Sequence, residues 1–198
     1  MKLWIKICGL TTDEGVAAAL AAGVDAIGFV FAPSKRRVTP AQAAQLTRDV
    51  PSHLPRIAVT LHPEQSLLDE VWRIFRPDVL QTDAQDLDTL KIPAGLAVLP
   101  VVRGGAVPDP LPARLLFEGP VSGTGITSDW TQAAQLSTRT QLILAGGLNA
   151  ANVAAAIREV RPFGIDVSSG VERAPGIKDP ARIHEFVQAA RHAASTAE

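Results

Sequence analysis

The chain has 198 residues, 46% of them apolar and 20% charged, a composition typical of a folded globular domain and not of a disordered chain. Its 19 lysines and arginines and 20 aspartates and glutamates give a formal net charge of -1, so it lacks the strongly basic surface that binds nucleic acid. The single cysteine, Cys8, excludes an internal disulfide and a metal site made of thiolates, and it indicates a reducing compartment.

Segments that direct a protein to or across a membrane are not predicted. Residues 1–6 contain no apolar stretch of signal-peptide length, and no segment approaches the roughly 18 apolar residues that a membrane span needs. We therefore expect a cytoplasmic protein that has neither a membrane nor a nucleic acid as a partner.

Short apolar runs alternate along the chain with alanine-rich stretches of helical period. The runs are apolar along most of their length, as expected for strands of a parallel sheet that is covered by helices. Eight strands are predicted, at residues 3–7, 25–31, 56–61, 78–81, 96–102, 114–117, 141–145 and 163–167.

Capping residues and helical periodicity predict a helix after most of these strands. The helices contain or directly follow Thr12, Thr39, Glu64, Asp129, Asn149 and Ile183. The connection after the fifth strand is different, because Pro108, Pro110 and Pro112 prevent a regular helix there.

This alternation runs without a linker or a charged tract, so we expect one α/β domain over residues 1–198. Repeated strand–helix units close in two common ways, as an open doubly wound sheet or as an eight-stranded barrel. The count of eight favours a compact, single-domain (β/α)8 TIM barrel with a degenerate fifth helix.

The residues that directly follow the strands are the candidate site, because such barrels place catalysis at the carboxyl ends of their strands. Ionisable and glycine-rich positions concentrate there. They are Cys8, Ser34, Lys35, Arg36, His62, Asp83, Arg103, Glu118, Gly146, Gly147, Ser168, Ser169 and Gly170.

Two glycine- and serine-rich loops follow the last two strands and predict a phosphate site. In these barrels, backbone amides and a helix N-terminus at this place often meet an anion. A tight turn and a locally capped loop are the alternatives for each loop taken singly. The loops contain Gly146 and Gly147, then Ser168, Ser169 and Gly170.

A third loop, with Gly123 and Gly125, could add further amides to this site. It lacks the third glycine of a dinucleotide fingerprint, so a nicotinamide cofactor is not expected.

Three ionisable residues each have a catalytic and a structural interpretation. Cys8 lies on the same strand face as Lys6 and is either a small buried residue or a base activated by a nearby cation. Glu118 is a general acid in a dry barrel mouth or a solvated loop carboxylate. Arg36 binds a substrate carboxylate or belongs to a charged loop.

Four segments with specific spacing carry a resemblance to a known family. They are K-I-C-G-L at residues 6–10, G-F-V-F then S-K-R within 28–36, L-A-G-G-L then N-V within 144–153, and D-V-S-S-G-V-E then P-G-I-K-D within 166–179. In these motifs, which extend over nearly the whole chain, the sequence resembles the phosphoribosylanthranilate isomerases of tryptophan biosynthesis.

The resemblance implies an Amadori rearrangement of N-(5-phosphoribosyl)anthranilate without cofactor or metal, in a monomer or homodimer. A general acid protonates the ribose ring oxygen to open a Schiff base, and a general base then removes the C2 proton. By position, the resemblance makes Cys8 the base and places Arg36 at the substrate carboxylate. The small-molecule substrate's phosphate would bind the glycine and serine loops.

The sequence departs from the family pattern at three strand ends. Glu118 stands where the family has an aspartate acid, Asp83 replaces a histidine, and the third strand leads into His62. These departures leave open a catalytically impaired or silent barrel that binds a phosphorylated ligand. Another phosphosugar isomerase or synthase of amino-acid biosynthesis is a further alternative, against which the K-I-C-G segment argues.

Overall fold

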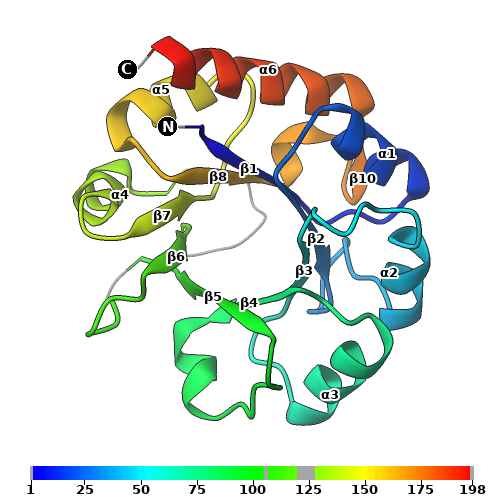
Figure 1. The fold of residues 1–198 in the computed structure, drawn as a ribbon. Helices are drawn as coiled ribbons and strands as arrows, with labels where there is room; N and C mark the ends of the chain where they lie inside the picture. Colours follow the sequence, from blue (N-terminus) through cyan, green and yellow to red (C-terminus); the bar gives the residue numbers. More distant parts are fainter. Residues whose placement is uncertain (1, 105–106, 120–127, 197–198) are drawn as a thin grey trace.

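The computed structural model describes residues 2–104, 107–119 and 128–196. Eight parallel strands form a closed barrel in chain order, and the pairing of the first with the eighth closes the ring (Figure 1). The strands are β1 (Trp4–Cys8), β2 (Ala26–Val30), β3 (Arg56–Val59), β4 (Val79–Asp83), β5 (Ala97–Val102), β6 (Arg114–Phe117), β7 (Gln141–Leu144) and β8 (Gly164–Val167). The predicted single-domain barrel is confirmed.

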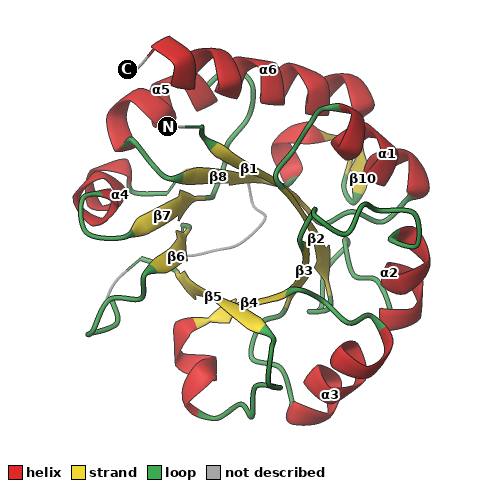
Figure 2. Cartoon of the chain, in the orientation of Figure 1, coloured by secondary structure: helices red, strands yellow, loops and turns green. Residues whose placement is uncertain are grey.

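Helices surround the ring of strands (Figure 2). They are α1 (Asp13–Ala21), α2 (Pro40–Leu46), α3 (Gln65–Ile74), α4 (Trp130–Ser137), α5 (Val153–Val160) and α6 (Pro180–Thr196). An N-cap side chain starts α1, α2 and α4. Thr12, Thr39 and Asp129 each accept a hydrogen bond from a backbone amide in the first turn. In the described part of the chain, no helix combines the length and the apolar character needed to cross a bilayer.

The degenerate fifth unit is confirmed, and the fourth unit is reduced as well. Within described residues 103–104 and 107–113, no helix separates β5 from β6 (Figure 2). Only a short 3-10 helix, η1 (Ala84–Asp88), follows β4, where the sequence analysis named no helix start. Pro93 and Gly95 lie in the short remainder of that connection and disfavour a longer helix.

A small antiparallel hairpin, which the sequence analysis did not predict, follows the eighth strand. It pairs β9 (Glu172–Ala174) with β10 (Ile177–Lys178). Gly176 makes the turn with φ +85°, and a Cβ there would lie 2.5 Å from the carbonyl oxygen of Lys35. Glycine therefore lets the hairpin pack directly against the loop after β2.

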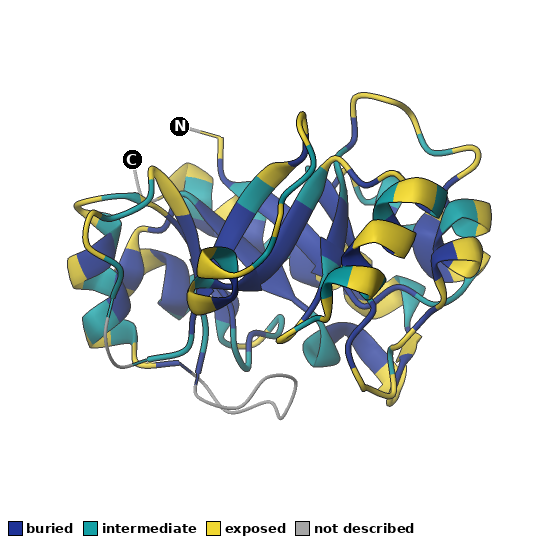
Figure 3. Cartoon of the chain, turned by 90° about the horizontal axis from the view of Figure 1, so that it is seen from below, coloured by how far each residue is buried: buried dark blue, intermediate teal, exposed yellow. Residues whose placement is uncertain are grey.

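Alternate residues of each strand face two different interiors. Ile5 and Ile7 belong to the main core between strands and helices, whereas Lys6 and Cys8 point into the barrel. Inside the barrel, a separate cluster of apolar residues that includes Val101 fills part of the space. Figure 3 shows the strands as mostly buried and the outer helix faces as exposed.

The loops after β7 and β8 are in direct contact. A Cβ at Gly170 would overlap the backbone carbonyl of Leu148 and lie 3.1 Å from Cα of Asn149. The Asn152 side chain fixes the first loop, because it donates to the carbonyl of Gly147 at 2.9 Å and accepts from the Asn149 amide at 2.9 Å. The two loops are consequently fixed relative to each other.

Gly170→Ala should push the loops after β7 and β8 apart and destabilise the protein. The added methyl group meets backbone, which cannot rotate away, so we expect the free energy of unfolding to fall by about 1–3 kcal/mol in denaturant titrations. Ser169→Ala, at the half-buried neighbouring position, is the control and should change it by less than about 0.5 kcal/mol. Equal values for the two variants would contradict the proposed steric role of Gly170.

Candidate active site

A cavity of about 450 Å³ opens at the carboxyl ends of the strands. It unites side chains that are far apart in the sequence, as the candidate-site prediction requires. Of the predicted positions, those that line it are Cys8, Ser34, Arg36, His62, Asp83, Arg103, Glu118 and Ser168.

The remaining predicted phosphate ligands lie beside this cavity, not in its wall. Gly146 and Gly147, with φ of +92° and +63°, follow β7, and Ser169 and Gly170 follow β8 in the short 3-10 helix η2 (Ser169–Val171). Their backbones are half-buried. Gly123 and Gly125 lie outside the described residues, so their role stays a prediction. 

Cys8 ends β1 and is buried beside a fully buried ammonium group. Lys6 Nζ lies 2.7 Å from Asp166 Oδ1. Burial raises the pKa of the Cys8 thiol above its ordinary value; Lys6 opposes this shift and Asp166 adds to it. The thiol is therefore protonated at neutral pH, with a cation next to it that favours the thiolate once a proton leaves.

Lys6 keeps its charge despite complete burial. Desolvation by itself would lower the pKa of this ammonium, but the neighbouring Asp166 and Cys8 groups outweigh desolvation and raise it. Gly28 provides the necessary space, since a Cβ there would lie 3.0 Å from Lys6 Cε and 3.2 Å from Cys8 Sγ.

Two residues that the sequence analysis did not assign to the site, Glu172 and Lys178, support the loop after β8. Lys178 Nζ donates to Glu172 Oε1 at 2.8 Å and to the Ser168 carbonyl at 3.0 Å. The Ser168 hydroxyl in turn donates to the Cys8 carbonyl at 3.0 Å. Both unassigned residues lie in the motif at residues 166–179, which was the available signal for them.

Arg36 lies in the cavity wall with its guanidinium fixed by two parallel hydrogen bonds. Nε donates to Glu172 Oε1 at 2.7 Å and Nη2 donates to Oε2 at 2.9 Å. Burial would raise the pKa of Glu172, but bonds from Arg36 and Lys178 lower it below its usual range. Gly9, with φ +74°, leaves room for the arginine stem. The structure thus holds Arg36 rigidly by one edge.

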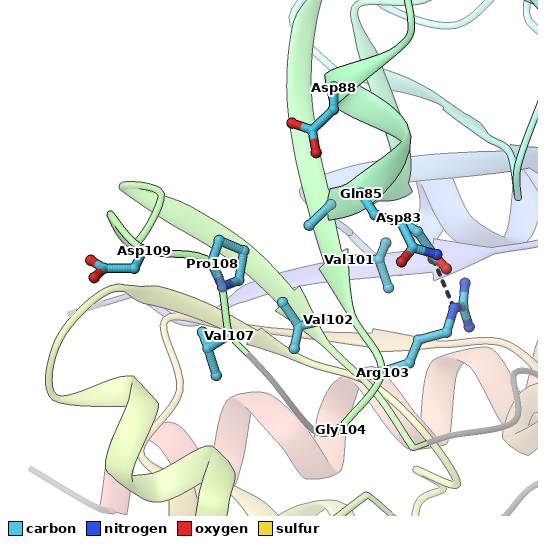
Figure 4. A pocket seen from close by; sticks show the side chains of 11 residues that line it. Asp83, Gln85, Asp88, Val101, Val102, Arg103, Gly104, Val107, Pro108 and Asp109 are labelled. Atoms are coloured by element: carbon cyan, nitrogen blue, oxygen red, sulfur yellow. Dashed lines mark hydrogen bonds and ion pairs between the residues drawn. The ribbon is translucent and has the colours of Figure 1, made fainter.

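The opposite side of the cavity carries Glu118, which directly follows β6. Its Oε1 accepts a hydrogen bond from Arg103 Nη1. Arg103 Nε in turn donates to Asp83 Oδ1 at 2.8 Å, the bond drawn in Figure 4. Glu118 is therefore no solvated loop carboxylate. Its side chain is only 12% exposed.

His62 stands at the mouth of the same side in an unusual conformation. Its φ is +46°, and Asp86 holds it there by accepting from the His62 amide at 3.1 Å and contacting Nδ1 at 2.7 Å. The hydrogen bond that Asp86 accepts from the exposed imidazole raises the pKa of His62. Its Nε2 lies 3.8 Å from Asp83 Oδ2.

A buried amide oxygen also points to a ligand. Gln81 lines the cavity, is 4% exposed, and its Oε1 accepts no hydrogen bond within the described part of the chain. Unpaired buried polar atoms are rare, so a hydroxyl donor on a bound molecule would satisfy this oxygen. Among the described residues, no group of three or more His, Cys, Asp or Glu side chains is placed to hold a metal ion.

Lys6→Met should destabilise the fold strongly. The change removes the cation from a buried pair and leaves Asp166 unpaired, so we expect the free energy of unfolding to fall by about 3–5 kcal/mol. Lys2→Met is a matched control, because Lys2 pairs with Asp25 at 2.8 Å on the surface and should lose less than about 1 kcal/mol. Similar small losses in both variants, measured by denaturant titration, would show that the buried pair does not stabilise the barrel.

Known sequences resemble this chain over almost its whole length. Residues 5–189 match the family described as N-(5'phosphoribosyl)anthranilate (PRA) isomerase. The chain is 40% identical over 194 residues to the N-(5'-phosphoribosyl)anthranilate isomerase of Streptococcus pneumoniae strain Hungary19A-6, covering 96% of this chain and 97% of that protein. It is 38% identical over 213 residues to the Mesorhizobium japonicum enzyme of that name, covering 98% and 97%.

Solved structures are also similar to this chain over nearly its whole length. TrpF from Jonesia denitrificans superimposes with a TM-score of 0.80 at 35% identity, covering 99% of this chain and 100% of that chain. A phosphoribosyl anthranilate isomerase in complex with reduced 1-(o-carboxyphenylamino)-1-deoxyribulose 5-phosphate has a TM-score of 0.80 at 29% identity, covering 96% and 99%. Monomers generated from the dimeric Thermotoga maritima enzyme have a TM-score of 0.75 at 29% identity, with the same coverage.

Proposed function

Because the chain belongs to the N-(5'-phosphoribosyl)anthranilate isomerase family, we propose that Cys8 and Glu118 are the general base and general acid of that reaction. The enzyme is an isomerase of tryptophan biosynthesis that converts N-(5'-phosphoribosyl)anthranilate into 1-(2-carboxyphenylamino)-1-deoxyribulose 5-phosphate. The observation that carries the assignment of residues is that both side chains line one cavity, from β1 and from the end of β6.

The first step opens the ribose ring. Glu118 donates a proton to the ring oxygen, the bond from that oxygen to C1 breaks, and the nitrogen lone pair forms the C1=N bond of a protonated Schiff base. The proton is delivered in a partly buried site, where charge interactions are stronger than in water.

The second step removes the proton from C2. The Cys8 thiolate takes it, the C–H electrons form a C1=C2 bond, and the C1=N electrons return to nitrogen, which gives an enolamine. The enolamine then loses the proton of its C2 hydroxyl and gains a proton at C1, which gives the ketone. The ammonium of Lys6 stabilises the thiolate that this step needs.

Substrate contacts follow from the charged and glycine-rich parts of the site. We assign the substrate carboxylate to Arg36, whose Nη1 edge is turned away from the two bonds to Glu172. The phosphate is assigned to the backbone of Gly146, Gly147 and the 168–170 loop, near the start of α5. A ribose hydroxyl would satisfy Gln81 Oε1. The predicted contribution of Gly123 and Gly125 lies outside the described residues.

A silent barrel that only binds the phosphorylated ligand is the second candidate, motivated by the change from aspartate to glutamate at the acid. It is disfavoured by the presence of Glu118 in the same cavity as Cys8, since a carboxyl group is still available there as the acid. Turnover by the purified protein distinguishes the two candidates.

We further propose that the enzyme works in the cytoplasm, where a free thiol such as Cys8 stays reduced. A monomer and a homodimer both fit this proposal. Relatives include a dimeric enzyme from which monomers were generated.

Cys8→Ala and Glu118→Gln should each reduce kcat by about 10²–10⁴-fold, because each removes one proton transfer. Turnover is followed by the loss of anthranilate-type fluorescence after phosphoribosylanthranilate is added. Thermal unfolding of each variant provides the control for folding. Unchanged turnover in Cys8→Ala would remove the base from the mechanism, and no turnover by the unmodified protein would favour the silent barrel.

The pH dependence of kcat/KM should show a plateau with a late fall. Ionising Glu118 removes the acid, whereas ionising Cys8 creates the base, so the two effects cancel between the two titrations. Activity therefore rises as the carboxyl titrates at low pH and falls only when the thiol titrates. Because burial raises the pKa of Cys8, the fall should begin above about pH 8.5, the value for an ordinary cysteine. A fall near neutral pH would contradict this assignment.

A further inference from the structure

Charged side chains form a continuous chain of contacts along one side of the cavity. Glu118 binds Arg103, Arg103 Nε lies 2.8 Å from Asp83 Oδ1, and the other Asp83 oxygen lies 3.8 Å from His62 Nε2. These groups come from the ends of β3, β4, β5 and β6. Three of them are the positions at which the sequence departs from the family pattern, and the structure brings all three together around Arg103.

One guanidinium therefore serves two carboxylates, through different nitrogen atoms. Asp83 takes Nε and Glu118 takes Nη1, as Figure 4 illustrates for the first of these bonds. The side chains of Arg103, Asp83 and Glu118 are 19%, 10% and 12% exposed, so solvent screens their interactions only partly. Fixing Nε also fixes the plane of the guanidinium, and hence the direction of the bond to Glu118.

We propose that Arg103 and Asp83 are positioning residues for the acid: Asp83 orients Arg103, and Arg103 holds the Glu118 carboxyl in the cavity and sets the pH at which that carboxyl loses its proton. The inference rests on the proposed function, which makes Glu118 the acid. It explains how a side chain one methylene longer than aspartate is held at a defined place in the wall, since geometric errors of about 1 Å cost on the order of 100-fold in rate.

The two positioning residues act on the proton of Glu118 in opposite directions. The positive charge of Arg103 favours the ionised carboxyl, whereas the negative charge of Asp83 partly neutralises Arg103 and favours the protonated carboxyl. The other charged or titratable groups that line the cavity stay in place in every variant below. They are Cys8, Arg36, His62 and Asp166.

Opposite shifts of one limb of the pH profile test the proposal. We expect Arg103→Met to move the low-pH limb of kcat/KM to higher pH and Asp83→Asn to move it to lower pH, each by about one pH unit. A reaction without enzyme is subtracted at each pH. Titration of the substrate itself is common to all variants and cancels in the comparison.

A second arginine–aspartate pair offers a matched control at the other end of the barrel. Arg56 Nε lies 3.0 Å from Asp78 Oδ2, where β3 and β4 begin. Arg56→Met and Asp78→Asn change the same charges as the test variants and should leave the limb in place. If thermal unfolding shows that Arg103→Met does not fold, Arg103→Lys replaces it, and we then expect a limb near that of the parent with lower kcat, because lysine keeps the charge but not the planar fork.

The possible results separate this inference from the proposed function. Turnover at the parent's level, with the low-pH limb levelling off at the parent's position in Glu118→Gln, would mean that Glu118 is not the acid, and the proposed function would fail in that part. If Glu118 is the acid, the residual activity of Glu118→Gln keeps rising with pH until the thiol titrates. A limb that changes in this way in Glu118→Gln but stays at the parent's position in Arg103→Met and Asp83→Asn would overturn only the inference. Shifts of the two variants in the same direction would overturn it as well.

Discussion

The ion pair between Lys6 and Asp166 stands where the barrel closes. The two residues are register partners of β1 and β8, 160 residues apart in sequence, and their side chains meet inside the barrel at 2.7 Å. An uncompensated charge at this depth would be costly, so the pair favours the register in which the ring is complete. The same ammonium lies next to Cys8 and offsets part of the burial that raises the pKa of the thiol. Closure of the fold and support of the proposed base thus depend on one contact.

A second set of contacts connects the loop after β8 to its neighbours. Lys178 and Arg36 both bind Glu172, which joins the hairpin after β8 to the loop after β2. The Thr11 hydroxyl donates to the carbonyl of Gly176 at 2.7 Å, which adds the loop after β1. Because each carboxylate oxygen of Glu172 has a charged donor, the burial of these groups is compensated. The short loops around Cys8 are therefore held by contacts with one another.

The two halves of the cavity provide different environments for the proposed acid and base. Cys8 lies in a fully buried setting beside Lys6, with Lys178 as a further cation that lowers the thiol pKa. Glu118 lies in a less buried setting in which an arginine and a second carboxylate act on it. Acid–base reactions at one site need groups whose surroundings hold their protons differently. Cys8 on one side of the cavity and Glu118 on the other have surroundings that differ in this way.

Local patterns in the sequence determined the strands, most helix starts and the single-domain barrel. Apolar runs and capping side chains such as Thr12 and Asp129 act within a few residues, so they are visible without the fold. Alternation along a strand was also enough to place Lys6 and Cys8 on one face. Strand-end position was enough to collect Cys8, Arg36 and Glu118 as candidates.

Only the tertiary structure decided which charged groups meet. The pairing of Arg103 with Asp83 and Glu118, the binding of Arg36 to Glu172, and the packing of the β9–β10 hairpin on the loop after β2 join residues distant in sequence. No local periodicity encodes such contacts, because they depend on closure of the ring and on the few ångströms by which its loops approach each other. The sequence thus determined the barrel and the candidate residues, and closure of the barrel decided their partners and their protonation.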